Sequence, residues 1–190
     1  MSSQAKTFLT PEEYLAIERK AEYKSEYFNG EMFALAGATR KHNLIAGNTF
    51  RQLGNQLQDR PCEAYMSDMR VGIPATGLYT YPDVIVVCGE PKFDDEYVDT
   101  LLNPAVLVEV LSPSTESYDR GRKSSNYRTV ESLAEYLLVS QDEYKVEQYA
   151  KQPDGRWLLT DIRSLEGVAD LASVQCVLKL KDVYEKVPLP

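Results

Sequence analysis

Two short apolar segments constrain the fold of this chain more than any other feature. They are residues 81–87 (YPDVIVV) and residues 105–111 (AVLVEVL). Each has the length and the β-branched content typical of a buried strand, and each holds one acidic residue, Asp83 or Glu109. A carboxylate beside a buried strand is costly unless it is paired, hydrogen-bonded or bound to a metal. We therefore interpret the two acids, on consecutive predicted strands, as half of a divalent-cation site.

The length and composition indicate one globular domain. The chain has 190 residues, of which 43% are hydrophobic and 26% charged, so we predict a single domain over 1–190 with its core at about 10–187. No apolar run approaches the roughly 20 residues needed to cross a bilayer, and the N-terminus lacks the apolar core of a signal peptide. We expect a cytoplasmic protein without a membrane partner.

The cysteines and the net charge exclude further classes of protein. Cys62, Cys88 and Cys176 do not have the spacing of a zinc site, so we predict three reduced cysteines that are mostly buried. The net charge of −8 argues against a protein that coats nucleic acid through a broad basic surface. It allows an enzyme that contacts nucleic acid through a local basic patch and a metal.

The pattern of apolar and turn residues predicts an α/β fold. A helix begins after Thr10 and ends at about Arg19, the Asn29–Gly30 pair forms a tight hairpin, and a second helix runs from about Thr39 to before Pro61. Strands are expected over 63–73, 81–88, 105–111, 135–139, 145–151 and 157–163, and helices over 117–128 and 180–186; loops are expected at Gly77, 92–99 and 112–115. We predict a central mixed β-sheet flanked by helices.

Glu109 is the strongest candidate site residue. Both faces of its strand are apolar, which indicates a central strand covered on both sides. The alternative is a structural ion pair with a nearby Arg or Lys. Asp83 follows Pro82, where turn chemistry is an alternative explanation, but beside Glu109 it becomes a second ligand. Two carboxylates, a backbone carbonyl and water form the oxygen-rich environment that Mg²⁺ prefers.

A basic segment follows the Glu109 strand. If residues 117–128 are helical, Arg120, Lys123 and Tyr127 share one face. Such a face could hold a phosphate or stabilise developing negative charge. A solvated cationic face in an acidic protein explains the same pattern equally well.

Three other polar residues carry less weight. Glu31 follows the hairpin turn, where a glutamate is usually exposed. His42 is the only histidine, which excludes a multi-histidine metal site, and its neighbours Arg40 and Lys41 favour a surface role. Asp68 is interpreted as a partner of Arg70 or the mark of a bulge.

Four segments together resemble the PD-(D/E)xK restriction endonuclease-like superfamily, and in particular its large bacterial group of uncharacterised restriction endonuclease-like proteins. The segments are 26–31 (EYFNGE), 80–83 (TYPD), 108–115 (VEVLSPST) and 118–123 (YDRGRK). The resemblance covers about 10–187. It implies the restriction endonuclease-like fold and a Mg²⁺-dependent phosphodiesterase that acts on DNA, with Mn²⁺ as an alternative metal.

The resemblance also implies roles for individual residues. Asp83 matches the motif aspartate, Glu109 the (D/E)xK acid, and Glu31 the additional acid found in many members. The carbonyl of Val110 would complete the metal ligands. The motif lysine should stand two residues after Glu109, where this chain has Leu111. In some members the lysine has moved to the following helix, and Lys123 fits that substitution.

The sequence leaves three hypotheses open. The first is a metal-dependent DNA endonuclease, expected by analogy to be a homodimer. The second is a binding module that keeps the fold without turnover, which Leu111 and the acidic net charge favour. The third is a structural protein whose Glu109 is only ion-paired. Any DNA specificity would come from loops such as 72–80 and 92–99.

Overall fold

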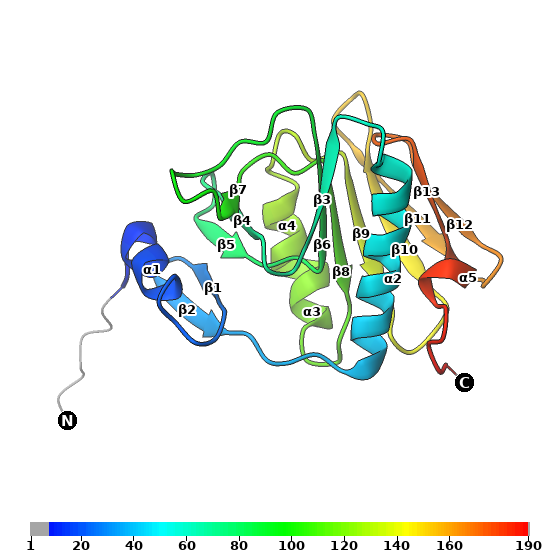
Figure 1. The fold of residues 1–190 in the computed structure, drawn as a ribbon, viewed down its shortest axis with the longest axis horizontal. Coiled ribbons are helices and arrows are strands. Elements are labelled where there is room, and N and C mark those ends of the chain that lie inside the picture. The colour runs from blue at the N-terminus through cyan, green and yellow to red at the C-terminus, as the bar shows by residue number, and fades with distance from the viewer. Residues whose placement is uncertain (1–7, 190) are drawn as a thin grey trace.

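The computed structural model describes residues 8–189 and places three layers side by side. A six-stranded sheet, in the order β11-β10-β9-β8-β6-β3, forms the middle layer. Its strands are β3 (Cys62–Met66), β6 (Val84–Cys88), β8 (Val106–Val110), β9 (Glu135–Val139), β10 (Val146–Lys151) and β11 (Trp157–Ile162). Neighbouring strands are antiparallel except β8 and β9, which are parallel. The predicted mixed sheet flanked by helices is confirmed (Figure 1).

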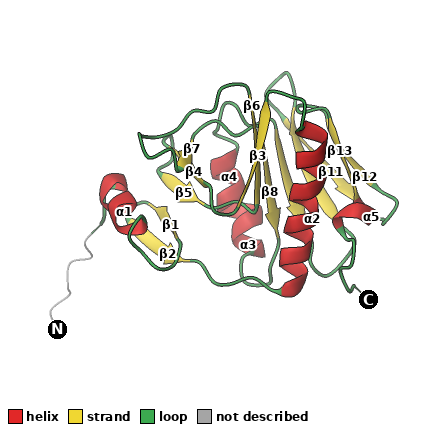
Figure 2. Cartoon of the chain, viewed as in Figure 1, coloured by secondary structure: helices red, strands yellow, loops and turns green. Residues whose placement is uncertain are grey.

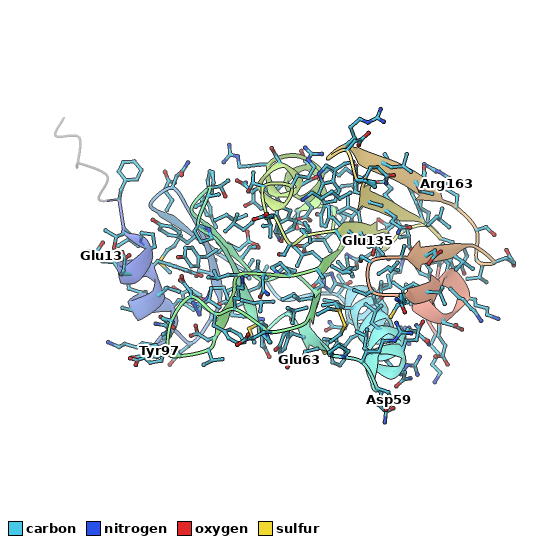
Figure 3. All side chains as sticks on the ribbon, turned by 90° about the horizontal axis from the view of Figure 1, so that it is seen from above. Glu13, Asp59, Glu63, Tyr97, Glu135 and Arg163 are labelled. Atoms are coloured by element: carbon cyan, nitrogen blue, oxygen red, sulfur yellow. A yellow bond between two sulfur atoms is a disulfide. The ribbon has the colours of Figure 1, made fainter. Side chains whose placement is uncertain are left out.

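Helices cover both faces of this sheet. One face packs against α2 (Arg40–Leu57) and α5 (Leu180–Val183) through a cluster that includes Ile45, Leu53 and Val108. The other face packs against a helical segment made of α3 (Glu116–Tyr118), η1 (Asp119–Lys123) and α4 (Ser124–Tyr127). The two helical layers lie on opposite sides of the strands when the molecule is seen from above (Figure 3).

A second sheet and a short hairpin complete the fold (Figure 2). The five-stranded sheet has the order β2-β1-β5-β4-β7. Its strands are β1 (Ser25–Phe28), β2 (Glu31–Ala34), β4 (Arg70–Ile73), β5 (Leu78–Thr80) and β7 (Thr100–Leu101), and α1 (Pro11–Glu18) packs on β1. The hairpin pairs β12 (Val168–Leu171) with β13 (Cys176–Lys179).

The helix starts and the hairpin turn predicted in the N-terminal half are confirmed. Thr10 caps α1 in a full capping box with Glu13, and the Thr39 side chain caps α2. Asn29 and Gly30 both have positive φ, at 48° and 86°, which is the backbone conformation that a two-residue hairpin turn requires.

Several predictions about single elements were wrong. The strand signal over 63–73 is two strands, β3 and β4, which belong to different sheets and are separated by a turn. The expected loop 72–80 is the β4–β5 hairpin, in which Gly72 pairs with Tyr79 and Ile73 with Leu78. The β12–β13 hairpin was not predicted; its alternating burial shows that only one face contacts the core.

The prediction of three reduced cysteines was wrong for two of them. Cys62 and Cys88 form a disulfide, and Cys176 is the free, buried cysteine of the described residues. The two bonded residues are direct partners in the antiparallel register of β3 and β6. Cross-strand partners lie within the distance that a disulfide spans, although they are 26 residues apart in sequence.

Candidate active site

The two acidic residues that the sequence singles out meet at one end of the central sheet. Asp83 directly precedes β6, and Glu109 lies in β8, the strand that pairs with β6. The antiparallel register pairs Val84 with Val108 and so brings Asp83 alongside Glu109. The Val110 backbone N–H donates a hydrogen bond to Asp83 Oδ2 at 2.7 Å. All five residues of β8 are buried, as predicted for a central strand.

A cavity of about 570 Å³ opens at this point. Asp83, Glu109, Val110 and Lys123 all line it, together with residues from the β2–α2 connection and from the loop after β8. Only 5% of Glu109 and 5% of Lys123 are exposed, so both lie at the bottom of the cavity. Asp83 is half-buried.

Lys123 reaches the cavity from the helical segment that follows β8. Its ammonium lies 2.9 Å from Glu109 Oε1, 3.0 Å from Glu26 Oε1 and 3.6 Å from Asp119 Oδ1. The segment contains a π-turn, in which the Ser124 N–H bonds to the Asp119 carbonyl five residues earlier. Such wide turns often occur at functional sites, because they re-aim the side chains of a helix.

Tyr127 and Lys123 both contact the same oxygen of the Glu109 carboxylate. The Tyr127 hydroxyl is buried and donates to Glu109 Oε1 at 2.6 Å. Within residues 8–189 these are the polar partners of the Glu109 carboxylate, so Oε2 has none among them. One oxygen of Glu109 is thus fixed by the protein and the other is available to a ligand.

The charges of the cavity are not balanced by its side chains. Four carboxylates line it, from Glu26, Asp83, Glu109 and Asp119, against two lysines, the buried Lys123 and the half-buried Lys24. Burial raises the pKa of Glu109 well above its ordinary 4.5, despite the opposing charge of Lys123, and burial also raises the pKa of Asp119. The carboxylates outweigh the penalty of burial on Lys123 and raise its pKa, so the ammonium stays charged.

This donor set fits a hard divalent cation. No group of three or more His, Cys, Asp and Glu side chains within residues 8–189 is arranged as a complete metal site. A Mg²⁺ site needs only one or two carboxylates, with water and other oxygens filling the remaining positions. Asp83, Glu109 and Val110 all line the cavity and would supply such oxygens, and a cation there would offset the excess of negative charge.

The glutamate of the β1–β2 hairpin that lines the cavity is Glu26, and not Glu31 as predicted. Glu31 lies in β2, half-buried, and is not part of the cavity lining, whereas Glu26 in β1 is buried and contacts both Lys123 and the Thr80 hydroxyl. The sequence analysis did not single out Glu26. The signal was present, because side chains alternate along the predicted hairpin and Glu26 shares a face with Phe28.

His42 also lies at the cavity, which corrects its predicted surface role. Its Nε2 is 2.7 Å from Asp83 Oδ1, and 16% of its side chain is exposed. The available signal was its position one turn before Ile45 and Ala46, on the face of α2 that is buried.

Two other polar predictions were wrong. Asp68 is exposed and pairs with Lys24 rather than with Arg70, which contacts Asp99 and the Tyr81 hydroxyl. Arg120 does not accompany Lys123 and Tyr127 into the cavity. It bonds to Glu116 and Glu147 outside the lining, because the π-turn rotates it away from the face expected for a regular helix.

Comparison with known proteins places the chain in a family. Residues 11–180 match the model of the Uma2 family, described as "Putative restriction endonuclease". The chain belongs to the Uma2 family. The uncharacterized protein sll1609 of Synechocystis is 44% identical over 81% of this chain and 87% of its own length. A second Synechocystis protein, the uncharacterized slr1290, is 39% identical over 93% of this chain and 91% of its own length.

A solved structure confirms the fold of this Uma2 protein. The crystal structure of a "putative nuclease belonging to DUF820" from Anabaena variabilis superimposes with a TM-score of 0.77, over 95% of this chain and 99% of that one. The two sequences are 18% identical, so this likeness concerns the fold alone. Membership of the Uma2 family supports a nuclease-like function. Within residues 8–189 no helix is both long and apolar enough to cross a membrane.

Proposed function

We propose that this Uma2 protein is a Mg²⁺-dependent endonuclease that hydrolyses phosphodiester bonds in DNA. The observation that carries the proposal is the meeting of Asp83, Glu109 and Lys123 at one cavity. The resemblance requires two acids on neighbouring strands and a lysine, and Lys123 supplies the ammonium that Leu111 cannot.

Each residue has a distinct part in the proposed reaction. Asp83, Glu109 and the Val110 carbonyl would hold the metal beside the phosphate. When bound, Mg²⁺ would polarise a phosphoryl oxygen and lower the pKa of a bound water. Lys123 stabilises the negative charge that develops on the phosphate, and Glu26 holds the Lys123 ammonium in place. The role first assigned to Glu31 passes to Glu26 in this proposal.

Plasmid cleavage with Mg²⁺ or Mn²⁺ tests the proposal. We would compare wild type with Asp83→Asn and Glu109→Gln, and use Glu90→Gln as the matched control, since Glu90 is exposed and is not part of the cavity lining. Nicking or linearisation by wild type and the control alone supports the proposal. Cleavage by all four proteins, or cleavage that persists in EDTA, indicates a contaminating nuclease.

The second candidate is a module that keeps the nuclease fold and binds nucleic acid or protein without turnover. It is favoured by Leu111 at the position of the motif lysine and by the net charge of −8. No cleavage of duplex or single-stranded DNA, together with a shift of labelled DNA in a gel, would favour this candidate over the endonuclease.

A further inference from the structure

The carboxylate of Asp83 is held at both of its oxygens. Val110 N–H donates to Oδ2 at 2.7 Å, and His42 Nε2 lies 2.7 Å from Oδ1. A carboxylate that binds a cation only accepts hydrogen bonds, so beside such a carboxylate His42 Nε2 is the donor to Asp83. Each oxygen keeps one further lone pair, which leaves Asp83 able to bind a ligand while its plane is fixed.

The backbone of His42 is itself fixed to the end of β8. The His42 N–H donates to the Thr39 hydroxyl, which caps α2 and in turn donates to Gln141 Oε1 at 2.6 Å. The buried Gln141 amide donates to the Leu111 carbonyl at 2.6 Å. This chain of hydrogen bonds connects the first turn of α2 to the strand that carries Glu109.

The packing of α2 on the central sheet also holds the His42 imidazole beside Asp83. His42 lies one turn before Ile45 and Ala46, whose side chains are buried against the central sheet. The anchored first turn and the packed second turn leave the ring little freedom to leave Asp83. Both the hydrogen bonds of the first turn and the packing of the second turn are needed, because a mobile imidazole would not restrict the Asp83 carboxylate.

We propose that His42 is a positioning residue that orients Asp83 for binding of a divalent cation. This inference rests on the proposed function, because it assumes that Asp83 is a metal ligand. Partners that hydrogen-bond to metal-binding carboxylates fix their orientation, and their removal typically weakens metal affinity by about 10–100-fold. Neither the superfamily resemblance stated above nor the match to the family model assigns a role to His42.

Titration calorimetry with MnCl₂, without DNA, tests this role independently of cleavage. His42→Gln and His42→Met have side chains of similar length, but only glutamine can donate to Asp83. Lys41→Ala is the matched control on the same turn, since Lys41 is outside the cavity lining. Melting curves in EDTA would establish that each variant is folded.

We expect His42→Met to bind Mn²⁺ about 10–100-fold more weakly than wild type, and His42→Gln and Lys41→Ala to stay close to wild type. Equal affinity of the methionine and glutamine variants, whether both are weak or both are normal, overturns the role of His42 as a donor. Absence of Mn²⁺ binding by wild type would instead overturn the metal-dependent function, and the inference with it.

Discussion

Replacing Lys123 by methionine tests the electrostatic account of the cavity. Methionine keeps most of the length of the side chain and removes its charge. The ammonium lies within 3.6 Å of three buried carboxylates, from Glu26, Glu109 and Asp119, so its loss leaves negative charge buried without a partner. Breaking a buried ion pair from one side costs about 3–5 kcal/mol of unfolding free energy.

The size of this effect is large enough to measure in two ways. In a protein of this length 1 kcal/mol shifts Tm by about 2–4 °C, so we expect Lys123→Met to melt about 6–20 °C below wild type. Urea unfolding in EDTA gives the free energy directly. Lys181→Met is the matched control, because Lys181 is exposed on α5, and we expect it to stay within about 0.5 kcal/mol of wild type.

The destabilisation should also depend on pH. Without Lys123 the folded-state pKa of Glu109, already raised by burial, rises further above its unfolded value. A raised pKa favours the fold at pH values below the unfolded pKa, and that contribution is lost as the pH rises through the folded pKa. The difference between wild type and variant should therefore shrink towards pH 4. A variant within about 1 kcal/mol of wild type at pH 7 would refute the reasoning.

Three further predictions concern stability. Tyr127→Phe removes a hydrogen bond to a charged group, and urea unfolding should show a loss of about 1.5–3 kcal/mol. Glu135 lies in the packed interior (Figure 3), and burial raises its pKa. Its stabilising contribution should thus be present below pH 4.5 and lost above it. The stability of wild type relative to Glu135→Gln should therefore fall as the pH rises above 4.5. A difference in unfolding free energy that does not change with pH contradicts this prediction. Reduction of the Cys62–Cys88 disulfide should cost about 2–4 kcal/mol, and a Cys62→Ser/Cys88→Ser variant should not respond to the reductant.

The elements that could be predicted from the sequence are those with a local cause. The capping box at Thr10 and the positive φ values at Asn29 and Gly30 depend on a few adjacent residues. The two acid-bearing strands were also recognisable, because an ionised group in an apolar run is anomalous wherever the run packs. Asp83 and Glu109 were therefore brought together correctly before their register was known.

The residues that the sequence analysis missed depend on contacts between distant segments. Glu26 shares a face with Phe28 in the predicted hairpin, but its burial also depends on the pairing of β1 with β5, about 50 residues later. The Cys62–Cys88 disulfide depends on the register of β3 with β6. His42 was misjudged because its charged neighbours in sequence were weighed above its position on the buried face of α2.

Apolar packing on the face of β8 that carries Glu109 explains why the lysine of the cavity is at position 123 and not at position 111. Leu111 shares that face, and it is buried in an apolar cluster with Tyr127, Val130 and Leu133. A lysine at 111 would place its ammonium in that cluster, where burial penalises the charge. Lys123 approaches from the helical segment that covers the cluster, and the π-turn directs it to Glu109 and Glu26. The apolar packing at the end of β8 and the cation of the cavity are thus supplied by different elements, and Leu111 by itself does not decide between the endonuclease and the module without turnover.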